Sequence, residues 1–441
     1  MRAVGSILLL LLCTVQPVYS QDKYQVDLSD LEKEVEQTAG KPYHLGGFLE
    51  FQPIFFGIDR GAAFSQLNFD LKRSGNTFMQ YNLGLRLEGS YKKDIFSVFF
   101  QTDTLVQNQL QGWQEETKLL QGLLSLRPSP NFSLEGGNKV FRWGKGYAWS
   151  PVAFIDRPKD PEDPEELRQG FTIFTADWNQ SFVGPLKNAA LSAVAVPVYE
   201  HVNTQFGQLN HMNFASKLYL LLYDTDIDFI VSTGSSRTTR YGFDFSRNIT
   251  TNLEVHGEWA RINNFQLTTI NAQGVGTTRE WNAISYLLGL RYLSAQETTY
   301  ILEYYHNGTG LTQSQFADFV TFTNNSYATF LSTGNDSGLA RASQLAEAAY
   351  GRPNPMRDYL YFRASQKEPF DILYFTPALT SIINLQDGSL VVIPELTYSP
   401  MTNLELRFRT PVLIGGKGTE YGEKQNDYRI DLRLRYYFEL F

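Results

Sequence analysis

Apolar and polar residues alternate with a period of two over long stretches of this chain. In residues 428–441 one face carries Tyr428, Ile430, Leu432, Leu434, Tyr436, Phe438 and Leu440, and the other carries Arg429, Asp431, Arg433, Arg435, Tyr437 and Glu439. A period of two is the period of a β-strand, and a helix does not produce it. About 14 residues is long for a strand of a soluble sandwich, but a tilted strand needs about 9–11 residues for the hydrocarbon of a membrane alone.

The same alternation recurs along the chain. It predicts strands near 45–57, 78–91, 94–106, 117–127, 131–142, 169–179, 187–199, 211–223, 225–235, 238–247, 251–264, 282–294, 297–308, 357–366, 372–385, 388–398, 402–414 and 427–441. Short turns alternate with longer connections, which lie at 58–77, 107–116, 143–168, 200–210, 265–281, 309–356 and 415–426. We therefore predict an all-β fold, a single transmembrane antiparallel β-barrel of about 18 strands, within about 16–20.

Three stretches lie outside the hairpin pattern. Residues 1–20 read as a secretory signal peptide with a basic Arg2 and an apolar core at 7–12, cleaved before Gln21. Residues 21–43 form an N-terminal segment with a short helix at 30–39, which is a periplasmic tail, a lumen plug or a docking helix, and 44–441 form the barrel. The loop 309–356 is expected to be helical at 315–331 and 339–350, as an extracellular cap or folded into the mouth.

Composition supports a barrel and narrows the chemistry. The chain has 25 Tyr and 32 Phe, yet its mean hydropathy is −0.28, as expected where each strand has one apolar face and aromatic girdles mark the interfaces. The net charge of −8 argues against nucleic acid as a partner. The only cysteine, Cys13, lies in the predicted signal peptide. We therefore predict no disulfide, no thiolate metal site, no haem attachment site and no cofactor.

These features together resemble bacterial outer-membrane porins: a signal peptide, an even set of alternating strands, a terminal Phe441 and a long third loop. The resemblance implies a channel whose third loop folds into the barrel and narrows it. Residues 136–146 and 303–308 are also similar to porin-like barrels that work with multihaem cytochromes in metal-reducing bacteria. One departure is that Leu440, and not Phe441, holds the lipid-facing register.

Charged residues on the inward register are the first candidate site. The basic residues expected to line the pore are Arg86, Arg407, Arg409, Arg429, Arg433 and Arg435. Glu405, Asp431 and Glu439 are interspersed among them. Two interpretations stay open. The charges form a structural ladder in which cross-strand partners neutralise one another, or they form a basic wall that attracts anions.

The third loop, 143–168, supplies the opposite charge. Its acidic residues are Asp156, Asp160, Glu162, Asp163, Glu165 and Glu166. If the loop folds inward, these carboxylates face the basic wall and a transverse field filters solutes by charge and width. If it stays outside, it is a solvated acidic face or a divalent-cation site.

Glu254, His256 and Glu258 form one inward stripe on a single strand. A histidine between two carboxylates could titrate or bind a metal. Residues two apart on one strand face lie about 7 Å apart, however, which is loose for direct metal ligands. A polar row in the lumen is the simpler interpretation, and we predict no metal site.

The main functional hypothesis is an outer-membrane channel for small polar or charged solutes, selected by the loop 143–168 and by the lumen charges. Its alternatives are a structural sheath around a multihaem cytochrome, with periplasmic and extracellular cytochromes as partners, and an uptake barrel gated by its N-terminal helix. An outer-membrane hydrolase is a further alternative, but no G-x-S-x-G or H-E-x-x-H motif occurs, so we predict no enzyme and no catalytic residue. The barrel should contact outer-membrane lipid, with both termini in the periplasm.

Overall fold

The computed structural model describes residues 42–68, 75–109 and 112–440, and the following concerns these residues. The predicted signal peptide, the helix at 30–39 and Phe441 lie outside them. The first half of the barrel contains β1 (Tyr43–Ile58), α3 (Ala63–Asn68), β2 (Thr77–Lys93), β3 (Phe96–Gln109), β4 (Gly112–Ser129), β5 (Phe132–Lys139), β6 (Phe171–Ser181), β7 (Leu186–Val198), β8 (His211–Leu222) and β9 (Thr225–Gly234).

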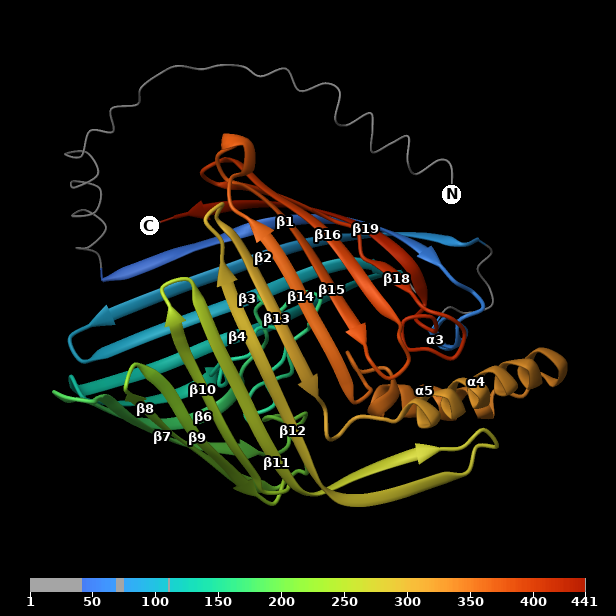
Figure 1. Cartoon of the computed structure of the whole chain (residues 1–441), viewed down its shortest axis with the longest axis horizontal. Helices are drawn as coiled ribbons and strands as arrows, with labels where there is room; N and C mark the ends of the chain where they lie inside the picture. The colour runs from blue at the N-terminus through green and yellow to red at the C-terminus, as the bar shows by residue number, and fades with distance from the viewer. Residues whose placement is uncertain (1–41, 69–74, 110–111, 441) are drawn as a thin grey trace. The chain divides into compact units, whose positions relative to one another are not determined.

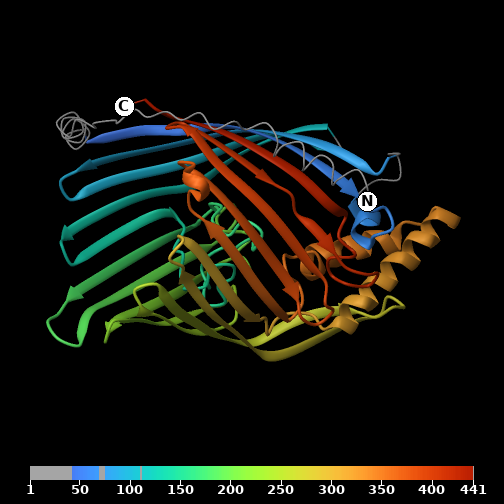
Figure 2. The same cartoon turned by 45° about the horizontal axis from the view of Figure 1, so that its top comes forward.

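The second half closes the barrel. It contains β10 (Arg240–Thr250), β11 (Leu253–Ile270), β12 (Gly276–Leu293), β13 (Thr298–His306), α4 (Gln313–Thr333), α5 (Ser337–Leu345), η1 (Ala346–Tyr350), β14 (Asp358–Gln366), η2 (Pro369–Asp371), β15 (Phe375–Asn384), β16 (Leu390–Met401), β17 (Leu404–Arg409), β18 (Val412–Ile414) and β19 (Asn426–Glu439). Strands that are neighbours in sequence pair antiparallel, except that β17 and β18 both pair with β16 and β19, and β1 pairs with β19 through Gly46 and Glu439 (Figures 1 and 2).

The barrel has 18 strands, as the alternation predicts. The pieces β17 and β18 form one strand interrupted at Thr410 and Pro411, because both pair with β16 and with β19. Proline has no N–H to donate to the ladder, which accounts for the interruption.

Side chains alternate across the wall as the sequence predicts. On β19, Leu432 is 46 % exposed on the outside, whereas the adjacent Asp431 is 2 % exposed and accepts a hydrogen bond from Gln52 Nε2 at 2.9 Å. Apolar residues therefore cover the outer surface, and polar residues meet inside. Among the described residues, none of the helices is both long and apolar enough to cross a membrane.

Some predicted boundaries were wrong. The predicted loops 265–281 and 107–116 are largely strand, since β11 runs to Ile270, β12 starts at Gly276 and β4 starts at Gly112. β-Branched threonines suit an extended hairpin, and the hydroxyls of Thr268 and Thr278 lie 2.8 Å apart across it.

The strand β5 is shorter than the predicted 131–142, because it ends at Lys139. The N–H groups of Phe141 and Trp143 donate to the Asp156 carboxylate, at 2.9 and 3.2 Å, instead of to a neighbouring strand. The chain leaves the wall at this point and turns inward.

The connection between β13 and β14 is helical, as predicted. Thr312 and Gln315 form a capping box at the start of α4, and Gly334, with φ 76°, ends this helix. The ring of Phe319 stacks on Tyr350 at 4.2 Å and meets Phe64 of α3 at 5.8 Å. Figure 1 shows α4 and α5 beside the far end of the β11–β12 hairpin, so these elements form a packed layer at the end of the barrel that carries the long loops.

Candidate functional site

The segment between β5 and β6 lies inside the ring of strands (Figure 2). Two buried carboxylates of the wall hold its backbone. Glu258 of β11 accepts hydrogen bonds from the N–H groups of Lys145 and Gly146, both at 2.6 Å. Glu303 of β13 accepts one from Ala148 at 2.9 Å and another from Tyr147. A buried carboxylate needs donors, and these four backbone groups supply them.

The turn that meets these carboxylates requires glycine. Gly144 has φ +99°, a left-handed conformation that favours glycine, and a Cβ there would lie 1.8 Å from Ser150 Oγ. A Cβ on Gly146 would lie 2.2 Å from the carbonyl oxygen of Trp149. The two glycines therefore let the loop backbone approach Glu258 closely.

The acidic residues of the loop meet the basic wall directly. Asp163 forms ion pairs with Arg407 at 2.8 Å and with Arg409 at 3.2 Å. Glu162 pairs with Arg429 at 2.8 Å. Burial alone would raise the pKa of Asp163, but the two guanidinium groups lower it below its ordinary value. The charges expected to face one another across an open lumen are thus in contact.

The other four loop carboxylates do not reach the wall arginines. Asp156 closes the loop on itself through the two N–H groups already described, and burial raises its pKa. Asp160 accepts a hydrogen bond from the Glu162 N–H at 3.0 Å, and burial and the Glu162 charge raise its pKa. Glu165 accepts one from the Tyr147 hydroxyl at 2.8 Å, and burial raises the pKa of Glu166.

Each arginine of the predicted basic wall has a carboxylate partner. Arg86 pairs with Asp103 at 3.1 Å, Arg433 with Glu405 at 2.9 Å and Arg435 with Glu50 at 2.6 Å. Together with the loop contacts of Arg407, Arg409 and Arg429, this accounts for all six. Three of these pairs join neighbouring strands, as in the ladder interpretation, and the other three arginines pair with the loop.

The three residues Glu254, His256 and Glu258 make two kinds of contact. His256 lies 2.9 Å from Glu303 and 3.6 Å from Glu254, while Glu258 binds the loop backbone. No cluster of three or more His, Cys, Asp or Glu side chains in the described part of the chain is arranged to hold a metal ion.

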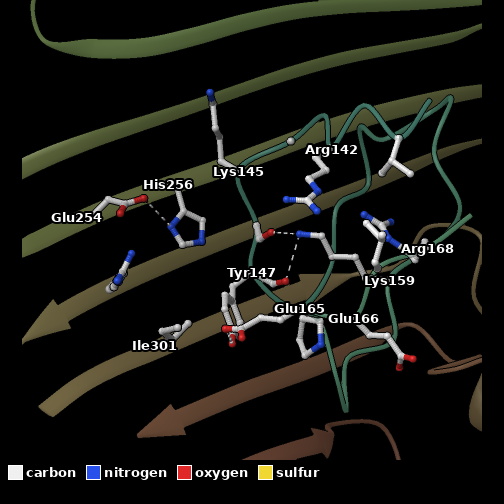
Figure 3. Close-up of a pocket in the computed structure, with 16 residues that line it drawn as sticks. Arg142, Lys145, Tyr147, Lys159, Glu165, Glu166, Arg168, Glu254, His256 and Ile301 are labelled. Atoms are coloured by element: carbon white, nitrogen blue, oxygen red, sulfur yellow. Dashed lines mark hydrogen bonds and ion pairs between the residues drawn. The ribbon is translucent and has the colours of Figure 1, made fainter. Parts of the chain in front are cut away.

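An inner cavity of about 370 Å³ lies between this stripe and the loop. Figure 3 shows Glu254, His256 and Ile301 on the strand side and Tyr147, Lys159 and Glu165 on the loop side. Lys159 Nζ donates to the carbonyl oxygen of Tyr147 at 3.1 Å and to that of Gly146 (Figure 3). Burial lowers the pKa of Lys159, and Glu258 and Glu303 partly offset this effect.

A larger cavity of about 660 Å³ lies on the other side of the loop. It is lined by the loop, by the β7–β8 and β9–β10 connections, by the segment before β14 and by residues of β10 to β13. Lys159 and Arg168 line both cavities, so these two side chains stand at the boundary between the two spaces.

Several of these residues were not found from the sequence. The alternation places Glu303 on the inward face, but nothing local indicates that its partner is the backbone of Tyr147. Lys159, Arg168, Arg237, Arg240 and Arg352 come from three segments far apart in the chain, and no spacing links them.

The barrel has the fold of bacterial outer-membrane porins. It is similar to Pseudomonas aeruginosa OccK5 (OpdH), with 11 % identity, a TM-score of 0.50 and coverage of 90 % of this chain and 98 % of that chain. It is also similar to Pseudomonas aeruginosa OprD, with 10 % identity, a TM-score of 0.50 and coverage of 90 % and 96 %. No protein-family model and no curated protein matches the sequence.

Proposed function

We propose that the protein is an outer-membrane channel for small polar or charged solutes, and that the loop 143–168 narrows the passage and selects among them. One observation carries the proposal. The loop is bound inside the barrel to two separate parts of the wall, by Glu258 and Glu303 on β11 and β13 and by arginines on β17 and β19. A loop that is bound to two separate parts of the barrel wall crosses the lumen and narrows it.

The space on either side of the loop supports this proposal. Cavities of about 660 Å³ and 370 Å³ share Lys159 and Arg168 in their linings, and both are large enough for a small hydrated solute. The exposed apolar outer face, on which Leu432 is an example, suits contact with outer-membrane lipid.

The orientation follows from the same proposal. In bacterial barrels the short turns face the periplasm and the long loops face outward. The chain start of β1 and the chain end of β19 lie at one end of the barrel, since Gly46 pairs with Glu439. This orientation places both termini in the periplasm and α4 and α5 outside the cell.

The alternatives are less well supported. A sheath around a multihaem cytochrome needs an interior wide enough for a folded protein, whereas here the loop and its two cavities occupy the interior. The alternative in which the segment 21–43 gates the barrel concerns residues that lie almost entirely outside the described part of the chain. We propose no enzymatic role.

Single-channel recording in planar bilayers tests the proposal. Purified, folded protein should give discrete conductance steps in KCl, and their size should rise when the loop is released from the wall. The absence of any step from folded barrel would contradict the proposal. Co-purification of the barrel with haem-staining proteins would favour the sheath instead.

A further inference from the structure

The larger cavity has more basic than acidic side chains in its lining. The wall arginines, in contrast, are each paired with a carboxylate. Seven charged side chains line it: Asp156, Arg157, Lys159, Arg168, Arg237, Arg240 and Arg352. Within the described ranges, no carboxylate lies within 4.0 Å of any of the six basic groups. The one acidic group, Asp156, already accepts two backbone N–H groups of the loop.

Neutral oxygens position these cations without neutralising them. Arg157 donates to the carbonyl and side-chain oxygens of Gln169 at 3.0 and 3.3 Å. Arg237 donates to the carbonyl oxygen of Phe154 at 3.1 Å, and its guanidinium lies 3.9 Å from the ring centre of Phe206. Stacking and carbonyl contacts hold a guanidinium in place but leave its charge uncompensated.

Arg240 is the clearest case. Its Nε is buried and has no hydrogen-bond partner among the described residues. A buried donor of a charged group that finds no acceptor is costly, and an anion in the cavity would remove that cost. Arg352 reaches the same cavity from the segment before β14, and it is exposed.

The protonation state is compatible with anion binding. Burial lowers the pKa of Arg237 to about 9, and it also lowers the pKa of Arg157 and Arg168. An arginine with a pKa of about 9 is still charged at neutral pH. The cavity therefore keeps its positive charge under ordinary conditions.

We propose that this cavity is a binding site for small anions that carry a carboxylate or phosphate group, and that they leave it through Lys159 and Arg168 into the inner cavity. Planar guanidinium groups bind both kinds of oxyanion through paired N–H donors. The proposal rests on the channel function, and it assigns selectivity to a different set of basic residues from those of the wall, whose charges are already paired.

Ion selectivity and block test the proposal. In a KCl gradient, the reversal potential of the wild-type channel should show preference for chloride. Citrate and inorganic phosphate, tested separately, should each reduce the chloride current, and the better blocker identifies the preferred oxyanion. Arg240→Gln should raise the half-blocking concentration about tenfold and weaken the chloride preference.

Two further variants separate the site from general effects. Arg352→Gln removes a positive charge at an exposed position of the same cavity, so the variant should fold normally. Like Arg240→Gln, it should raise the half-blocking concentration of citrate and phosphate. Arg127→Gln makes the same change at the exposed chain end of β4, outside the cavity lining, and should change neither block nor reversal potential.

Failure of this inference can be told apart from failure of the channel proposal. A wild-type barrel that conducts KCl without preference for chloride, and that neither citrate nor phosphate blocks, would overturn the anion site and leave the channel intact. A folded barrel that conducts nothing would overturn the channel. Calorimetric titration of citrate and phosphate into the detergent-solubilised barrel then decides the site directly, and no heat of binding would overturn it.

Discussion

His256 forms its contact with Glu303 across an intervening strand, over the position where Gly289 has no side chain. The three residues lie in one row, since His256 pairs with Gly289 and Gly289 pairs with Glu303. A Cβ on Gly289 would lie 2.0 Å from His256 Nε2, which is itself 2.9 Å from Glu303 Oε1. The glycine therefore lets the imidazole reach the carboxylate that also holds the loop.

Gly289→Ala should disrupt this contact. The new methyl group displaces the imidazole, and strain of this kind costs about 1–3 kcal/mol. We expect the folded barrel to lose its structure at a lower denaturant concentration, measured by tryptophan fluorescence in detergent. Gly416→Ala is the matched control, because a Cβ there would meet no atom within 4 Å. Equal stability of the two variants would show that the row contributes nothing.

Glu258→Ala should loosen the loop without disturbing the wall. The variant removes the acceptor of the Lys145 and Gly146 N–H groups. Each buried backbone donor left unpaired costs about 1–3 kcal/mol. We expect larger conductance steps and more open-channel noise in single-channel records. Glu115→Ala, on the exposed end of β4, should behave as the wild type, and an unchanged conductance in Glu258→Ala would argue that other contacts hold the loop.

The ion pairs of Asp163 should make stability depend on pH. Arg407 and Arg409 hold the pKa of Asp163 in the folded state below its ordinary value. The stabilisation is then fully present above the pKa of the unfolded chain and is lost as pH falls through the folded-state pKa. Unfolding between neutral and acid pH measures it. Asp163→Asn should cost about 1–3 kcal/mol at neutral pH and reduce the pH dependence.

The pKa of Glu166 is shifted in the opposite direction from that of Asp163, so its effect on stability has the opposite sign. Burial raises the pKa of its carboxyl group in the folded state, so ionisation opposes folding and its effect diminishes as pH falls through that pKa. Glu166→Gln should therefore leave stability unchanged or raise it at neutral pH, in the same unfolding measurements. A loss of stability in Glu166→Gln as large as that in Asp163→Asn would contradict this assignment.

Lys145→Met should destabilise the loop at neutral pH. Lys145 Nζ lies 3.1 Å from Asp228 and 3.9 Å from Asp244, two buried carboxylates that are directly paired across β9 and β10. Burial lowers the pKa of Lys145, but the two carboxylates raise it above its ordinary value overall. Its stabilisation is therefore present below the unfolded-state pKa and is lost as pH rises through the folded-state value.

Limited proteolysis of the loop measures this effect. We expect faster cleavage within 143–168 in Lys145→Met at neutral pH, and recovery in acid, where the carboxylates are protonated. Lys118→Met is the control, since its partner Glu116 lies on the same exposed strand edge. Cleavage of both variants at the wild-type rate would show that the buried pair tolerates the loss of its cation.

The strands could be predicted because their signal is local. On β19 the residues from Tyr428 to Glu439, apart from Tyr437, show their face by their own polarity, and the apolar outside and polar inside keep the two faces distinct. The signal failed where the apolar face turns inward. In the hairpin within 265–281, Leu267 and Ile270 are buried against the helical layer while Thr268 is exposed, so the pattern of apolar residues outside and polar residues inside did not mark it.

The site could be predicted only in part, because its contacts join distant positions. The inward direction of Glu258 and the wall arginines followed from register, and loop carboxylates that face these arginines were one of two alternatives for the loop. The individual partners were not predicted, since Glu258 and Lys145, for example, are 113 positions apart. The unpaired positive charge of the larger cavity was not predicted for a related reason. Arg240 differs from Arg407 in its three-dimensional surroundings, and the sequence next to each residue does not reveal this difference.

The separation of the loop from its anchors has a consequence for how the barrel assembles. Glu162 and its partner Arg429 are 267 positions apart, and Arg429 lies on the last strand. Contacts between such distant positions form late, because the intervening chain must be ordered first. The contact of Glu162 with Arg429 can form only after β19 has joined β17 and β1, whereas the contacts of the loop with β11, β13 and β17 do not involve β19. The last strand therefore closes the wall and completes the anchoring of the loop in the same step.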